Sequence, residues 1–423
     1  MAYKPFNQEN LRVLRSTSDY SRQRSKESQL AAAFILGIIG SILFIVVLMN
    51  NKIAALDMII GIIFGSVMYR GDFSFSANLR NPVYKHSYKF TLLFWKMCVL
   101  TTIGLNGIIF IKTKLGLFDY EAYLSQPTPV SPYFCLAATI FGAGLMLLGS
   151  AGTGLIKKCA NGKGDYILAL IFYFLGSYSG VFVRELALKY TGERTFYLPE
   201  MFGWGKALLI QFILLSIYFQ IAYKGVKKHG FYEKRDFQTI PSIIKRRYTL
   251  KKKLSLITNE LFLKGIEANA GIYIITILAL IYFFFNSKVI ATAMPLSVFG
   301  YKLLNNLGVD VSNVLTPAVY KQVMTPFFKQ TGLMLVVGFA IGSAFVPLIR
   351  AEYKPCLIKS KKQALTMILG GFMVGFGVQG IYGANIGEVY GAISMLSLSG
   401  YIIIPFILIG LFLAKPLYKW LLS

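Results

Sequence analysis

The chain has 423 residues, of which 55% are hydrophobic, 15% aromatic and only 15% charged, and its mean hydropathy is +0.58. An ordinary soluble domain of this length does not carry so many apolar side chains, so the composition indicates a membrane protein with many spans. The formal net charge of +26 would suit a nucleic-acid-binding protein. The lysines and arginines lie in the loops, however, where they orient membrane helices, so nucleic acid is not an expected partner.

Apolar runs long enough to cross a bilayer follow one another along most of the chain. A span needs about 20 apolar residues, and fewer where a segment is packed inside protein. We predict spans at 30–49, 53–69, 89–111, 131–150, 166–186, 203–223, 269–287, 331–349, 364–381 and 399–415. The span at 53–69 is a shorter one, and the others are full spans. The fold class is an all-α polytopic membrane protein with about 10 spans.

The basic residues gather in three segments, at 4–26, 224–253 and 350–362. Lysine and arginine near span ends stay on the cytoplasmic side, and the span order puts all three segments on one side with both termini. The polar first 30 residues do not read as a cleaved signal peptide. We expect the basic loops to face the cytoplasm and its anionic lipid head groups.

Two glycine clusters at equivalent places predict an internal repeat. Superposing Gly144–Gly154 on Gly377–Gly387 matches three anchor positions, and each copy is flanked by apolar spans. The predicted organisation is a basic N-terminal arm (1–29), a first transmembrane repeat (30–223), a basic cytoplasmic linker (224–268) and a second repeat (269–423). Repeat-built transporters place their substrate at the repeat interface, where broken or re-entrant helices expose backbone groups.

The glycines in these clusters predict breaks in the helices inside the membrane. Gly149, Gly152 and Gly154, and in the other half Gly380, Gly383 and Gly387, let the backbone leave the helix so that the next short helix presents free N–H groups. Such helix starts attract anions. The alternative is close helix packing through small residues, which is common in membranes. A phosphate-binding loop is disfavoured because no strand precedes the glycines.

Three stretches resemble motifs of the YeeE/YedE sulfur-transport family. They are MYRGDFSFSANLRN (68–81), GSAGTGLIKK (149–158) and YGANIGEVYGAISMLSLSGY (382–401). The resemblance covers nearly the whole chain beyond residue 30. It implies two pseudo-symmetric helical halves in the inner membrane and uptake of thiosulfate, an anion passed along motif cysteines. The positions that match these cysteines are Ser74, Ala151 and Ala384 in this chain.

Backbone amides, hydroxyls and small side chains are therefore expected to line the substrate path. The candidates are Ser74, Ser76, Asn78, Ser150, Ala151, Gly152, Thr153, Gly154, Gly383, Ala384, Asn385 and Gly387. Charged candidates are Arg70, Arg80 and Glu388, since charges at membrane depth are costly and usually functional. Alternatively, Arg70 and Arg80 reach the cytoplasmic surface, and Glu388 favours a helix start.

Three functions compete. The leading one is a permease for a small solute, most plausibly a sulfur-containing or other small inorganic anion. The second is a non-transporting membrane subunit that binds a cytoplasmic protein or anionic lipid through its basic loops. An intramembrane enzyme is the weakest, because the four cysteines and two histidines show neither metal-ligand nor nucleophile spacing, and neither a cofactor nor a metal is expected. If Phe75, Tyr382 and Tyr390 blocked both sides with no polar groups behind them, transport would be disfavoured.

The predicted topology is testable with reporter fusions or cysteine labelling at 4–26, 224–253 and 350–362. All three segments should report the cytoplasm, because each carries a cluster of basic residues that resists translocation. A periplasmic signal from 224–253 would overturn the span count.

Overall fold

The computed structural model describes residues 8–118, 123, 128–229, 265–383 and 385–422, with the backbone alone for 8–25, 385, 386, 388 and 422. Its longer helices, in chain order, are α1 (Gln8–Asn50), α2 (Lys52–Arg70), α3 (Ala77–Lys85), α4 (Lys89–Lys114), α6 (Pro132–Leu148), α7 (Gly152–Ala160), α8 (Asp165–Leu188), α10 (Trp204–His229), α12 (Ala268–Asn286), α13 (Ala293–Asn306), α14 (Pro317–Met324), α15 (Thr331–Ile349), α16 (Lys361–Gly380) and α18 (Ser399–Leu422). Short elements connect them: α9 (Leu198–Phe202), the 3₁₀ turn η3 (Phe327–Lys329), the π-helix η4 (Asn385–Gly391) and α17 (Ala392–Ser394).

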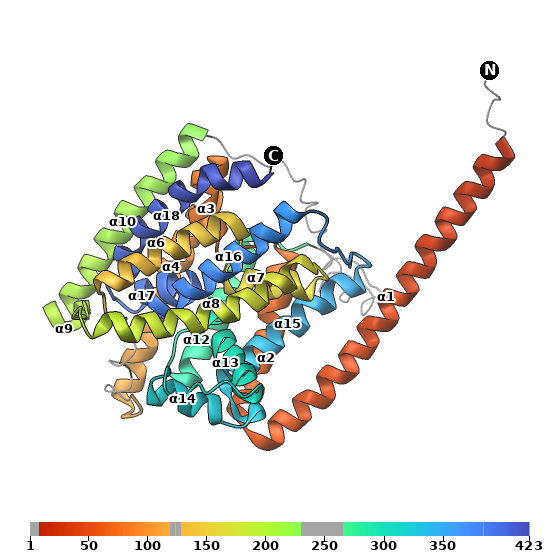
Figure 1. The fold of residues 1–423 in the computed structure, drawn as a ribbon. Helices are drawn as coiled ribbons and strands as arrows, with labels where there is room; N and C mark the ends of the chain where they lie inside the picture. The colour runs from red at the N-terminus through yellow and green to blue at the C-terminus, as the bar shows by residue number, and fades with distance from the viewer. Residues whose placement is uncertain (1–7, 119–122, 124–127, 230–264, 384, 423) are drawn as a thin grey trace, which may run out of the picture.

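The expected all-α membrane fold is confirmed. Within the described residues, ten helical stretches are long and apolar enough to cross a bilayer, and each corresponds to one predicted span. The first differs in its start: α1 is one 43-residue helix that begins at Gln8, well before residue 30. Its N-terminal part extends beyond the body of the molecule (Figure 1).

The two predicted halves interlock through pairs of helices that lie far apart in the sequence. Helix α8 packs along α16, and α6 packs along both α16 and α18. Helix α2 packs along α15, and α4 along α12. In the two halves α2 corresponds to α12, α4 to α15, α6 to α16 and α8 to α18. When each helix is replaced by its counterpart, the α8–α16 pair becomes the α18–α6 pair, and the α2–α15 pair becomes the α12–α4 pair. This is the packing expected of two repeats related by a twofold axis, with α6 and α16 meeting at the centre.

Glycines allow these helices to approach closely. A Cβ atom at Gly375 would overlap the carbonyl oxygen of Tyr173, and one at Gly176 would overlap that of Phe372, so neither side of the α8–α16 crossing has room for a side chain. On the other pair, Gly142 meets the carbonyl of Ile407 in the same way. Close backbone approach gives van der Waals contact where the hydrophobic effect between helices is weak.

The ends of the helices that adjoin the basic loops gather at one end of the bundle, here called the basic end. The N–H of Ile266 donates to the carbonyl of Arg70 (3.3 Å), and the Tyr69 hydroxyl donates to Glu352 (3.0 Å). Lys415, near the C-terminus, donates from Nζ to the carbonyl of Val83 (2.8 Å). The chain before and after residues 230–264 therefore reaches the same end as the 350–360 loop and α18.

The glycine crossing gives a test of the packing. We expect Gly375→Ala to lower stability by about 1–3 kcal/mol, because the new methyl group must push the two helix backbones apart. The matched control is Gly107→Ala on α4, where a Cβ would meet no atom within 4 Å and should raise stability by about 0.5–1 kcal/mol. Thermal unfolding in detergent measures both; an unchanged melting temperature for Gly375→Ala would contradict the described crossing.

Candidate functional site

The predicted break between α6 and α7 is present. Helix α6 ends at Gly149, whose φ of +68° lies in the left-handed region that favours glycine, and whose N–H donates to the carbonyl of Leu145. Ala151 is extended (φ −124°, ψ −172°), and α7 begins at Gly152 with no side chain capping it. Ser150 and Ala151 are 1% and 4% exposed, so the backbone leaves the helix inside the protein.

The first segment, residues 71–76 after α2, meets this break directly. The N–H of Ala151 donates to Oγ of Ser76 at 3.2 Å. Gly154 makes the approach possible, because a Cβ there would lie 2.7 Å from Cβ of Ser150 and 4.0 Å from the Ser76 hydroxyl. Two of the three motif regions identified in the sequence therefore touch.

Several donors at this junction have no acceptor. Within the described residues no hydrogen bond involves the N–H groups of Gly152, Thr153 and Gly154, which are the orphan donors of the first turn of α7. The Ser150 hydroxyl is also buried without a partner in the described part of the chain. Buried polar groups of this kind are normally satisfied. Together they offer a positively polarised, dry site of the kind that holds an anion.

A fourth segment, residues 287–292 between α12 and α13, completes the junction and was missed by the sequence analysis. A Cβ at Gly152 would lie 3.3 Å from Oγ1 of Thr292, and a Cβ at Gly387 would lie 3.5 Å from Cβ of Ala291. The Tyr173 hydroxyl fixes the segment's end by donating to the carbonyl of Ala293 (2.8 Å). The repeat itself was the available signal, since this segment occupies in the second half the place of residues 71–76.

The third region contains the second break, in a different form from the predicted short α-helix. Helix α16 ends before Tyr382, which is left-handed (φ +53°), and Gly383 donates its N–H to the carbonyl of Val378. The chain continues as the π-helix η4, whose wider turn replaces the expected α-helical start. Ala384 and the side chains of Asn385 and Glu388 lie outside the described residues.

Two of the aromatic side chains that could block a substrate path, Phe75 and Tyr390, pack against each other. The ring of Phe75 lies 6.4 Å from that of Tyr390, and both are buried. Polar groups do lie behind Tyr390: its hydroxyl shares a hydrogen bond with Thr101 (2.6 Å), and the neighbouring Thr102 accepts from Gln211 (3.4 Å). The pattern that would have argued against transport, bulky rings backed only by apolar groups, is absent around Tyr390 in the described structure.

The remaining candidates have other positions. Ser74 is half-buried and its carbonyl accepts from the N–H of Ala77. Asn78 is buried but accepts from the Tyr218 hydroxyl (2.7 Å) and from Thr91, so it binds α10 and α4 rather than the break. Arg70 is half-buried and lies at the basic end, where its carbonyl accepts from the N–H of Ile266.

Arg80, in contrast, lies beside the first break, in a cavity of about 450 Å³. Its guanidinium carbon lies 4.9 Å and 5.1 Å from the ring centres of Tyr84 and Tyr418, and its Nε donates to the carbonyl of Met146 (3.3 Å). A Cβ at Gly149 would lie 3.4 Å from the guanidinium carbon. The cavity wall is formed by Arg80, Leu147, Leu148, Gly149, Lys158, Tyr166, Ser360, Gln363, Thr366, Met367, Tyr418 and Leu421.

Lys158 of α7 gives this cavity, here called the inner cavity, a second basic side chain. Its Nζ donates to the Tyr166 hydroxyl (2.5 Å) and to the carbonyl of Leu148 (3.5 Å). The wall carries no aspartate or glutamate among the described residues. Lys157, one residue earlier, instead donates to the carbonyl of Phe73 (3.1 Å) and so holds the first segment against α7.

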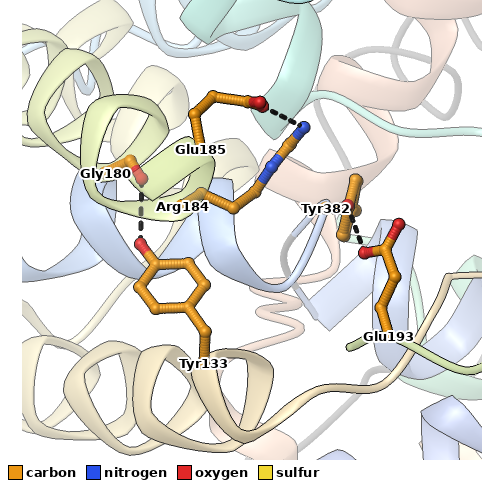
Figure 2. A network of polar contacts seen from close by, with 6 residues as sticks. All are labelled: Tyr133, Gly180, Arg184, Glu185, Glu193 and Tyr382. Atoms are coloured by element: carbon orange, nitrogen blue, oxygen red, sulfur yellow. Dashed lines mark hydrogen bonds and ion pairs between the residues drawn. The ribbon is translucent and has the colours of Figure 1, made fainter. Parts of the chain in front are cut away.

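A second arginine marks the second break. The superposition that places Gly144 on Gly377 also places Gly149 on Tyr382, and both residues are left-handed. Arg184 of α8 lies over the Tyr382 ring, with 4.5 Å between guanidinium carbon and ring centre. Figure 2 shows its bond to Glu185 (2.9 Å) and the neighbouring bond from Tyr382 to Glu193 (3.3 Å). Each break in the helices therefore has an arginine beside it.

The fold and this junction define an integral membrane transporter of the class built from two halves with broken helices. The chain matches the family model for sulphur transport over residues 70–413, and it belongs to that family. It is 24% identical over 369 residues to the thiosulfate transporter TsuA of Escherichia coli, covering 85% of this chain and 92% of the relative. It is 20% identical over 370 residues to the TsuA of Spirochaeta thermophila, covering 84% and 95%.

The left-handed turn at the first break can be tested. Gly149→Ala should lose about 1–2 kcal/mol from the strained backbone and also crowd Arg80. The matched control is Gly116→Ala at the end of α4, which has nearly the same φ (+67°) but open space around it. Both variants should unfold at lower temperature, and only Gly149→Ala should also impair transport in a proteoliposome uptake assay. Equal transport by both variants would contradict a role for the Gly149 turn.

Proposed function

We propose that this protein is a permease that carries a small, sulfur-containing inorganic anion of the thiosulfate type across a bacterial inner membrane, with both termini and the basic end in the cytoplasm. The observation that carries the proposal is the buried, uncapped start of α7, which stands next to the inner cavity. Donors that have no acceptor among the described residues lie on one side of Gly149, and two basic side chains lie on the other, so both sides of the break suit a negative charge.

The route supplies hydrogen bonds that suit an oxyanion. The N–H groups of Gly152 and Thr153 and the Ser150 hydroxyl are short, fixed donors in a dry place, where hydrogen bonds to a charged acceptor are strong. None of these amides depends on the side chain at position 151. Alanine in place of the family's cysteine therefore removes a soft thiol but leaves the donors for oxyanion oxygens. We expect binding to depend on the oxygens of the anion more than on its sulfur.

The inner cavity supports release of the anion toward the cytoplasm. Arg80 and Lys158 are two basic side chains in a wall that also includes Gly149, the residue that follows α6 at the break. Both cations are held by carbonyls at the C-terminal end of α6, which satisfies part of their hydrogen bonding. An anion that passes the break would exchange backbone N–H donors for side-chain cations. At the other break, Arg184 provides the corresponding charge.

The positive-inside rule supports the proposed orientation. The described ends of the basic segments meet at the basic end, and the inner cavity lies there beside the Lys415-bearing helix α18. The alternative remains a non-transporting subunit that binds a protein or anionic lipid through the basic loops. Residues 230–264, which carry most of the central loop, lie outside the described residues.

The test is uptake of radiolabelled thiosulfate, sulfite, sulfate and selenite into proteoliposomes. Arg80→Gln and Lys158→Gln should each raise the KM for the transported anion roughly tenfold to a hundredfold, since each removes a charge-assisted hydrogen bond of about 1.5–3 kcal/mol. The matched control is Lys359→Gln, an exposed lysine of the same end, which should leave KM unchanged. If the wild type takes up none of the four anions, the permease proposal fails and the binding-subunit alternative replaces it.

A further inference from the structure

Helix α2 carries a buried carboxylate that the anion route does not use. Asp57 is 0% exposed, in the part of α2 near the end opposite the basic end. Its Oδ1 accepts a hydrogen bond from Nδ2 of Asn286, the last residue of α12, at 2.8 Å. Its Oδ2 is buried and has no hydrogen-bond partner within the described residues. A carboxylate with one unmet oxygen in an apolar interior calls for a bound proton or cation.

No protein cation neutralises Asp57 in the described structure. Helix α15, packed along α2, contains no ionisable side chain between Thr331 and Ile349, and neither does the part of α1 from 28 to 50. From α12, the neutral Tyr282 faces the carboxylate. The buried Lys112 of α4 donates instead to the Ser287 hydroxyl (3.1 Å). The side chains of Lys52, Lys288 and Lys329 are exposed.

The partner of Asp57 leads directly to the transport junction. Asn286 also donates to the carbonyl of Tyr282 (3.2 Å), and it is followed by Ser287, which is left-handed (φ +52°). These residues begin the 287–292 segment, whose other end contacts Gly152 and Gly387 at the two breaks. One short segment therefore connects the carboxylate to both breaks.

We propose that Asp57 is the coupling site of the transporter: it binds one proton, and that proton travels with the anion. The proposal rests on the proposed function. Only one unmet oxygen of Asp57 is available, and the described surroundings do not supply the several oxygen ligands that a metal cation requires, so the ligand is a proton rather than Na⁺.

The sign of the coupling follows from charge. An ionised Asp57 places a negative charge in the same dry interior that must accept an anion, and protonation removes it. Protonation of Asp57 should therefore raise the affinity for the anion, and anion binding should favour the protonated form of Asp57 by the same factor. Uptake should increase as the external pH falls.

The first experiment measures labelled thiosulfate uptake by the full-length protein in proteoliposomes, with and without an inward proton gradient. The wild type should be stimulated at least fivefold by the gradient. Asp57→Asn keeps an oxygen for Asn286 but cannot titrate, so it should lose the stimulation while retaining exchange without a gradient. Asp57→Glu should recover part of the stimulation. The control Asp310→Asn, an exposed aspartate in the loop before α14, should respond like the wild type.

Persistent proton stimulation in Asp57→Asn, or stimulation of the wild type by a Na⁺ gradient alone, would overturn the proposal. A second measurement does not require transport: the infrared band of a protonated carboxyl group, in the wild type minus Asp57→Asn difference spectrum. The band should disappear on alkalinisation, and thiosulfate should move its midpoint to higher pH. A missing band, or a midpoint that thiosulfate leaves unchanged, refutes the coupling site even if uptake fails for other reasons.

Discussion

The constraint on which this structure depends is that backbone polar groups inside a membrane need partners within the protein. Two chain segments leave the helix, after α6 within the candidate membrane span Pro132–Ala160 and after α16 between two such spans, and at the first of them Ser150 and Ala151 are buried in protein. At the first break the backbone is only partly satisfied: Ser76 binds the N–H of Ala151, while the donors of the first turn of α7 have no acceptor among the residues that the structure describes. A passing anion can supply what the protein omits. The cost of an unmet donor thus becomes a driving force for binding.

This incomplete site requires a rigid surrounding, and glycines provide it. At the α8–α16 and α6–α18 crossings, backbone carbonyls of one helix occupy the space that a side chain on the other would need. The two halves are therefore held in register by backbone contact, close to the breaks. Because α6 and α16 both lie at the centre, and a left-handed residue follows within two residues of each helix, we expect a shift of one half to change the surroundings of both breaks together. Alternating access in repeat-built transporters relies on such motion.

The sequence predicted the spans and the places of the breaks because both depend on local patterns. Hydropathy over about 20 residues located the helices, and the glycines located the end of α6 and the start of α7. It could not show that Ser76 rather than Ser74 reaches Ala151, because that depends on how residues 71–76 fold back after α2. Lys158 and the 287–292 segment were missed for the same reason: Lys158 gains its role from the cavity that it shares with Arg80 and Tyr418, and the segment gains its role from Gly152 and Gly387, so both depend on contacts distant in the sequence. The domain boundaries and the site residues as a set stay predictions.

The charges beside the two breaks suggest how one scaffold handles an anion in opposite directions. Arg80 stacks between tyrosines, with the uncapped helix start and Lys158 nearby and no acidic residue in the described cavity wall. Arg184 stacks on Tyr382 at the equivalent place, but it binds Glu185, and Tyr382 binds Glu193. An anion approaching Arg184 must compete with a carboxylate, whereas one at Arg80 competes only with carbonyls. The arginines beside the two breaks thus differ in availability, and in the proposed transporter that difference would bias the two ends of the route, since a guanidinium already paired with a carboxylate attracts a second anion less.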